Sequence, residues 1–234
     1  MIKIRKSNER GKTKIDWLES YHSFSFGDYY DPHNMAFGPL RVINDDTILP
    51  SAGFPTHPHR DMEIITIVTQ GVIAHRDSTG SEGVIRVGEV QKMSAGKGIF
   101  HSEFNASDKE ILKLFQIWII PKEMGLKPAY EDMQYNTDEK KNKLFLVASG
   151  NHADGVIYIH QDAKIFLSDL DKNYEQKYSV QKDNGIYLHV VNGKIVVEEN
   201  ELTQGDAIMI TEMEKIKWTA LENSSIILFD VAMN

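Results

Sequence analysis

Gly53-Phe54-Pro55-Thr56-His57-Pro58-His59 opens the stretch of sequence that decides the fold, and Gly98-Ile99-Phe100-His101-Ser102-Glu103 closes it. The pairs His57/His59 and His101/Glu103 each place polar side chains two residues apart. In an extended strand, such side chains share one face. Two such pairs facing each other across a small barrel would bring three imidazoles and a carboxylate to one cation. The stretch therefore predicts a metal site.

The identity of the carboxylate is left open by spacing alone. Glu63 lies four residues past His59 and would share its face if the strand were unbroken, so Glu63 and Glu103 are alternatives. Three neutral imidazoles and one carboxylate suit Fe(II), Mn(II), Co(II), Ni(II), Cu(II) or Zn(II). On an octahedral ion, four ligands leave two positions where a substrate oxygen can bind beside O2, as an oxygenase requires.

Composition limits the classes of function. The 234 residues carry 34 acidic and 26 basic side chains, a net charge of −8, which disfavours direct binding to nucleic acid. The chain has no cysteine, which excludes disulfides, cysteine nucleophiles and cysteine-closed zinc sites and fits a cytoplasmic protein. No run approaches the ~18 apolar residues of a membrane span, so we expect no membrane partner.

Short β-branched segments separated by turns dominate the chain from residue 62 onward, which predicts an all-β sandwich or barrel. Residues 121–142 are rich in proline, glycine and charge, and we expect them to connect two domains. A turn glycine after a β-branched strand, followed by a Gly-acid pair, occurs as Gly71 with Gly88-Glu89 and again as Gly193 with Gly205-Asp206. This echo predicts an internal duplication whose second copy lacks the histidines.

These motifs resemble the cupin superfamily and, within it, the pirin family. The resemblance rests on residues 53–60, on Gln70-Gly-Val-Ile-Ala-His-Arg-Asp-Ser-Thr-Gly80, on Met93 to Glu103 and on Ser23-Phe-Ser-Phe-Gly-Asp-Tyr-Tyr-Asp-Pro32. Two departures are minor: Asp61-Met62 stands where many pirins have glycine and an aromatic residue, and two extra residues separate Gly88 from Gly96 relative to the general cupin motif.

The resemblance implies two tandem jelly-roll-type cupin barrels, which we place at residues 1–130, with the metal site, and 131–234, without metal ligands. It implies one divalent metal, usually iron in pirins, held by His57, His59, His101 and Glu103. General cupins would use Glu63 instead. The closer match to pirins favours Glu103, with Glu63 orienting a ligand imidazole.

The function that the resemblance implies is a metal-dependent dioxygenase similar to quercetin 2,3-dioxygenase. A flavonol 3-hydroxyl, or another enolic or phenolic group, would lose its proton to Glu103 as catalytic base, and O2 would cleave the ring with loss of carbon monoxide. The alternative is a pirin-like redox-sensing regulator that acts through a protein partner. A third reading makes the flavonol activity incidental to another enolic or phenolic substrate.

The other histidines are expected to be surface or hydrogen-bonded residues: His33, His75, His152, His160 and His189. His75 shares a hairpin with charged Arg76 and Asp77, which predicts a solvated face. His22 either faces the pocket or packs among aromatic residues. Core positions, rather than a substrate platform, are expected for Phe24, Phe26, Phe37 and Trp118.

Overall fold

The computed structural model describes residues 1–233, and within that range the chain is almost entirely β-strand. The only helical segments described are two short 3-10 turns, Ser7–Glu9 (η1) and Thr137–Lys140 (η2). Neither is long or apolar enough to cross a membrane, and no other helix occurs in residues 1–233. The prediction of an all-β chain is confirmed.

The chain forms two compact units, each with one seven-stranded and one four-stranded sheet. The first barrel comprises residues 11–36 and 40–135, and the second comprises residues 1–10, 37–39 and the chain from Asn136 onward. The four-stranded sheets have the same strand order, β5-β10-β7-β8 and β16-β21-β18-β19, as a duplicated fold requires. This confirms the predicted tandem arrangement.

The strands of the first barrel are β2 (Gly11–Lys14), β3 (Leu18–His22), β4 (Leu40–Ile48), β5 (Gly53–His59), β6 (Glu63–Gln70), β7 (Val72–Asp77), β8 (Glu82–Arg86), β9 (Glu89–Ser94), β10 (Ile99–Asn105), β11 (Leu112–Ile119) and β12 (Ala129–Gln134). Those of the second are β1 (Ile2–Arg5), β13 (Phe145–Ser149), β14 (Ile157–Tyr158), β15 (Ala163–Leu170), β16 (Glu175–Ser179), β17 (Asn184–Asn192), β18 (Lys194–Val197), β19 (Asn200–Thr203), β20 (Ala207–Ile210), β21 (Lys215–Ala220) and β22 (Ser224–Ala232).

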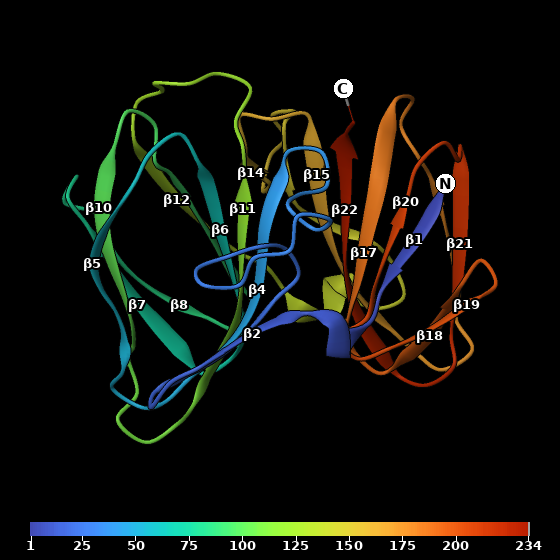
Figure 1. Ribbon diagram of the computed structural model, residues 1–234, viewed down its shortest axis with the longest axis horizontal. Coiled ribbons are helices and arrows are strands. Elements are labelled where there is room, and N and C mark those ends of the chain that lie inside the picture. Colours follow the sequence, from blue (N-terminus) through green and yellow to red (C-terminus); the bar gives the residue numbers. More distant parts are fainter. Residues whose placement is uncertain (234) are drawn as a thin grey trace. The chain divides into compact units, whose positions relative to one another are not determined.

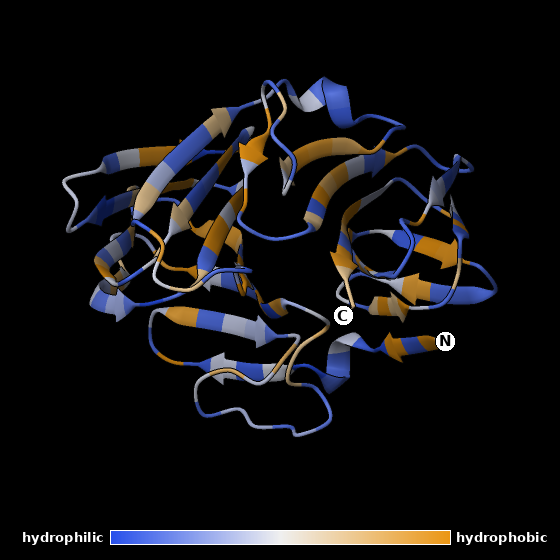
Figure 2. Ribbon diagram, turned by 90° about the horizontal axis from the view of Figure 1, so that it is seen from above, coloured by the Kyte–Doolittle hydropathy of each residue, from blue (hydrophilic) through white to orange (hydrophobic). Residues whose placement is uncertain are grey.

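In the first barrel, the sheet β5-β10-β7-β8 faces the sheet β12-β9-β6-β11-β4-β3-β2 (Figure 1). The two sheets meet in an apolar layer in which Ile73 and Ile85 from the smaller sheet pack with Ile48, Leu112 and other residues of the larger one. Each such buried side chain stabilises the fold by roughly 1.5–3 kcal/mol relative to exposure. Hydrophobic and hydrophilic segments alternate along many of the strands (Figure 2).

The strand at residues 2–5 was expected in the first domain, residues 1–130, but it belongs to the second barrel. Strand β1 pairs with β20, from Ile2 opposite Ile210 to Arg5 opposite Ala207, and so completes the larger sheet of the second barrel. The local alternation of apolar and charged residues predicts a strand here, but the strand's partner lies about 200 residues away in sequence.

The expected connection over residues 121–142 also contains a strand. Strand β12 pairs with β9 along its length, from Ala129 opposite Ser94 to Gln134 opposite Glu89. It is an edge strand with mostly polar, partly exposed residues, and polar edge strands lack the strong apolar alternation that makes buried strands easy to recognise.

Candidate metal centre

Three imidazoles converge at one end of the smaller sheet in the first barrel. Strands β5 and β10 are antiparallel neighbours, with His57 opposite His101 and His59 opposite Ile99. The ring centroids are 4.4 Å apart for His57 and His101, and 4.8 Å apart for each of the other two pairs. One ligand nitrogen from each ring lies within 4.8 Å of the others, close enough to share one ion.

The expected geometry needs one correction. The two histidine-bearing segments do not face each other across the barrel, because β5 and β10 are adjacent strands of the same sheet. The imidazoles meet because alternate residues of neighbouring strands project from one face of a sheet. A register shift between His101 and Glu103 then places Glu103 opposite Phe54.

The hydrogen bonds and burial of these histidines favour ring nitrogens with free lone pairs. His57 Nδ1 lies 2.7 Å from the Pro55 carbonyl oxygen, which can only accept, so Nδ1 carries the proton and Nε2 is left with its lone pair. His101 is buried, and its Nε2 has no hydrogen-bond partner. Burial, reinforced by the neighbouring imidazoles, lowers the pKa of His101 to about 2 and that of His59 to about 4. These two rings are therefore neutral at neutral pH, as metal ligands must be.

Glu103 lies beside this cluster with its carboxylate turned toward the larger sheet. Gln116 Nε2 donates to one carboxylate oxygen at 2.7 Å, and Thr66 Oγ1 approaches the other at 3.5 Å. Burial, and then the charge of Asp46, raises the pKa of Glu103 to about 7, against the effect of these donors. Among the close groups of ligand atoms in residues 1–233, Glu103 is grouped with His101 and His75, and not with His57 and His59.

The alternative carboxylate, Glu63, occupies a different environment. Strand β5 ends at His59, Asp61 has a positive φ of 50°, and Glu63 begins β6 in the larger sheet. The strand is therefore broken, and the premise that would place Glu63 on the face of His59 does not hold. The buried Glu63 carboxylate instead lies 3.9 Å from Lys92 Nζ.

A pocket of about 410 Å³ opens beside the imidazoles, within the ~300–1,000 Å³ range of small-molecule sites. Its lining includes His57, His59 and Glu103, together with polar and aromatic side chains from both sheets: His22, Phe26, Asn44, Asp46, Phe54, Gln116 and Trp118. Two of these aromatics, expected in the core, line the pocket, and Trp118 also packs against the buried cluster of Ile64, Met93, Ala95 and Ile99. Phe26 and Trp118 meet edge to face at 5.3 Å in the pocket wall, and Trp118 also contacts His59 at 4.8 Å.

The other two aromatics, Phe24 and Phe37, are buried as expected. His22 satisfies both expectations, since it lines the pocket and its ring also packs against Phe26 at 5.2 Å and Tyr29 at 6.5 Å. The buried ring makes hydrogen bonds of 2.8 Å with Thr13 and with Asn44. No pattern in the sequence indicated that Asn44, Asp46 and Gln116 line the pocket. They belong to strands of the opposite sheet, and only the packing of the two sheets brings them to the site.

His75 contradicts the prediction of a solvated face. It is 2% exposed, and the adjacent Arg76 takes the outward position of strand β7. Its Nε2 lies 3.2 Å from Asp77, and its Nδ1 lies 3.1 Å from Gln91 Nε2 and 3.5 Å from His101 Nδ1. In contrast, His33 and His152 are exposed, as expected.

In the second barrel, the corresponding sheet positions carry no imidazole. Trp218 of β21 pairs with Gln176 of β16, and Ile216 pairs with Tyr178, in the register that joins His101 to His57 and Ile99 to His59. The equivalents of His57, His59 and His101 are thus Gln176, Tyr178 and Trp218, and Ala220 corresponds to Glu103. The indole of Trp218 is almost fully buried in the apolar cluster of the second barrel.

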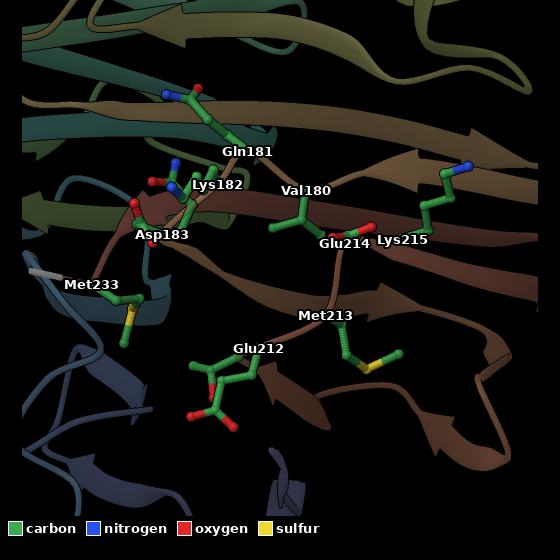
Figure 3. A pocket seen from close by; sticks show the side chains of 11 residues that line it. Val180, Gln181, Lys182, Asp183, Glu212, Met213, Glu214, Lys215 and Met233 are labelled. Carbon is green, nitrogen blue, oxygen red and sulfur yellow. The ribbon is translucent and has the colours of Figure 1, made fainter.

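A larger hollow of about 960 Å³ lies in the second barrel, between the β16–β17 and β20–β21 connections (Figure 3). Its charged lining mixes Lys182 and Lys215 with Asp183, Glu212 and Glu214, and it contains no histidine. We assign the candidate site to the smaller pocket, because imidazoles and a buried carboxylate converge only there among the described residues.

Comparisons with known proteins agree with the motifs. The Pirin family model matches residues 3–119, and the model of the quercetinase C-terminal cupin domain matches residues 146–231. Quercetin 2,3-dioxygenase of Escherichia coli (strain K12) is 41% identical over 231 residues, covering 99% of both chains. A pirin-like protein of Caulobacter vibrioides is 40% identical over 233 residues, covering 99% of this chain and all of the relative.

Solved structures give the same result for the fold. The crystal structure of the bacterial pirin YhhW from Escherichia coli in complex with nickel(II) superposes with a TM-score of 0.94, at 40% identity and 99% coverage of both chains.

Proposed function

The chain belongs to the pirin family, and on that premise we propose that its first barrel is a metal-dependent dioxygenase resembling quercetin 2,3-dioxygenase. Its substrates would be flavonols or other small molecules with an enolic or phenolic hydroxyl, together with O2. One observation carries the proposal: the three imidazoles of His57, His59 and His101 converge at a pocket whose wall contains the buried carboxyl of Glu103.

The residues present fit a divalent transition metal. His101 has a buried ring nitrogen without a partner, and the proton of His57 is engaged by the Pro55 carbonyl, so both rings offer Nε2. The ion, with iron(II) as first candidate and manganese, cobalt, nickel, copper or zinc as others, would supply a Lewis-acidic position for a substrate oxygen and an electron path to O2. His57, His59 and His101 would hold it, with Glu103 as the fourth ligand when its carboxylate turns toward the ion.

Glu103 is also the residue best placed to accept the proton of a substrate hydroxyl. It faces the pocket, and Gln116 and Thr66 hold both of its oxygens. A pKa of about 7, raised chiefly by burial, matches a general base that works near neutral pH. A carboxylate held by two side chains of the opposite sheet can take up a proton without movement of the backbone.

The walls of the pocket suit an aromatic substrate. Phe26, Phe54 and Trp118 form apolar surface beside His57 and His59, and aromatic side chains bind planar rings by stacked or edge-to-face contacts. These side chains would hold the ring of the substrate with its hydroxyl toward Glu103 and would limit the access of water to the reacting atoms.

Oxygen uptake by metal-reconstituted protein tests this function. Metal-free protein is loaded with each of the six ions in turn and supplied with a flavonol or with members of a phenol panel. We expect oxygen consumption with at least one ion, and loss of both bound metal and activity in His57→Ala and His101→Ala. His152→Ala, an exposed histidine of the second barrel, is the matched control.

Two results would count against the proposal. Unchanged metal content in both purified variants would contradict the ligand assignment. Full metal occupancy with no oxygen uptake across the panel would contradict the dioxygenase. Recovery of a specific protein partner by the metal-loaded form would then support the regulator.

A further inference from the structure

A chain of hydrogen bonds runs from the rim of the smaller sheet to His101. Asp77 Oδ1 accepts from Thr79 N at 2.8 Å, Thr79 Oγ1 at 2.6 Å and Ser81 N at 3.3 Å. These donors fix the carboxylate in its ionised form and leave Oδ2 to His75 Nε2 at 3.2 Å. Asp77 and His75 are 7% and 2% exposed, so the inner part of the chain is shielded from water.

This arrangement determines which nitrogen of each ring carries a proton. An ionised carboxylate only accepts, so His75 must carry its proton on Nε2. In a neutral imidazole the other nitrogen is then an acceptor with a single lone pair, and His75 Nδ1 accepts from Gln91 Nε2 at 3.1 Å, with His101 Nδ1 facing the same lone pair at 3.5 Å. A lone pair on His101 Nδ1 would be repelled there, so the contact favours the His101 proton on Nδ1 and its lone pair on Nε2, the buried atom without a partner.

We propose that Asp77 and His75 are positioning residues that fix the tautomer and ring orientation of His101, so that its Nε2 lone pair faces His57 and His59. The inference rests on the metal site of the proposed function. In metal sites, such outer hydrogen bonds to a ligand histidine typically change metal affinity about 10- to 100-fold. In His57, a single hydrogen bond from Nδ1 to the Pro55 carbonyl oxygen fixes the tautomer in the same way.

The packing around His75 supports a fixed orientation. The Tyr130 ring lies 5.1 Å from the His75 ring, and its hydroxyl occupies the space that a side chain at Gly83 would need. Because His75 is held by Asp77, Gln91 and this ring, its Nδ1 is fixed toward His101. An alternative is that His75 is itself a ligand, since His75, His101 and Glu103 also form a close group.

Three variants separate these possibilities. His75→Leu removes the acceptor, whereas His75→Gln keeps a carbonyl that can accept from His101. Asp77→Asn preserves side-chain volume, but its amide nitrogen can donate to His75 Nε2, which would move the His75 proton to Nδ1. The Nδ1–H group of His75 would then face the Nδ1–H group of His101. Arg76→Gln, on the exposed face of the same strand, is the control.

Nickel(II) affinity of the metal-free protein is the first readout. We expect about a 10- to 100-fold loss in His75→Leu and in Asp77→Asn, and recovery of most of the affinity in His75→Gln. Addition of Asp77→Asn to His75→Gln should then lower nickel(II) affinity little further, because the double variant has no imidazole at position 75 whose proton Asp77→Asn could move. Equal affinities in all variants, or His75→Gln as weak as His75→Leu, would overturn the inference, and the second result would favour His75 as a ligand.

The second readout needs no metal. Nitrogen-15 chemical shifts of the metal-free wild type should show His75 protonated at Nε2 and His101 at Nδ1, and Asp77→Asn should move the His75 proton to Nδ1. The opposite tautomers would refute the inference even if the site binds nickel. Failure of the wild type to bind any metal, with the tautomers as expected, would count against the proposed function instead.

Discussion

The close approach of β5 and β10 at Gly53 makes a sharp prediction for the variant Gly53→Ala. A Cβ atom added at Gly53 would lie 2.2 Å from the Glu103 carbonyl oxygen and 2.5 Å from Phe104 Cα. Ordinary contact begins at 3.4 Å, so the two backbones must separate by about 1.2 Å. Both obstacles are main-chain atoms, which cannot move aside as a side chain can.

Overpacking of this kind typically costs about 1–3 kcal/mol, and here the separation occurs in the strand pair that carries His57 and His101. We therefore expect Gly53→Ala to lower the free energy of unfolding of the first barrel by about 2 kcal/mol. The separation at Gly53 exceeds the ~0.5 Å tolerance of a preorganised site, and Glu103 lies at the point of separation, so nickel(II) affinity should fall at least about tenfold. Hydrogen exchange of peptides spanning β5 and β10, and a nickel titration, measure the two effects.

Ser102→Ala is the control for this experiment, because Ser102 lies on β10 with its side chain on the face opposite to His101 and Glu103. It should leave exchange and affinity unchanged. Wild-type stability and wild-type affinity in Gly53→Ala would refute the reasoning. Lost stability with unchanged affinity would show that the imidazoles tolerate separation of their strands.

Three further predictions concern the remaining features. Burial lowers the pKa of His189 in the second barrel to about 3, so between pH 6.5 and 3 the unfolded chain binds a proton that the folded chain does not. This histidine should therefore lower the free energy of unfolding by about 2 kcal/mol from pH 7 to pH 5, as measured by urea unfolding, and the decrease should be smaller in His189→Gln. Trp118→Ala removes a pocket wall and should raise KM for a flavonol about tenfold or more with metal content unchanged by elemental analysis. Gln116→Leu removes a hydrogen bond that lowers the pKa of Glu103, so the acidic limb of the pH–activity profile should move to higher pH; an unmoved limb would argue against Glu103 as the base.

The histidine cluster could be predicted in part, because local strand geometry places His57 and His59 on one face of β5 and His101 and Glu103 on one face of β10. The pairing of β5 with β10, which brings the imidazoles together within one sheet, was not predicted. The break at Asp61 could not be read from spacing, since a positive φ at a non-glycine residue leaves no pattern in the flanking sequence.

The residues that surround the cluster were harder to predict for a physical reason. Gln116, Trp118 and Asp46 lie on the opposite sheet, and their approach to the site follows from how two sheets stack, which no local pattern encodes. His75 was misjudged from its charged neighbours. Alternation along β7 sends Arg76 outward and both His75 and Asp77 inward, so the charge at position 76 says little about position 75.

The pairing of β1 with β20 has a consequence for the order of events during translation. Residues 2–5 are synthesised before their partners at residues 207–210, which follow about 200 residues later, on the order of 10–40 s at ordinary synthesis rates. The first barrel, complete at residue 135, can fold during that interval. Until then residues 2–5 have no β20 to pair with, and β20 has an open edge until β1 docks.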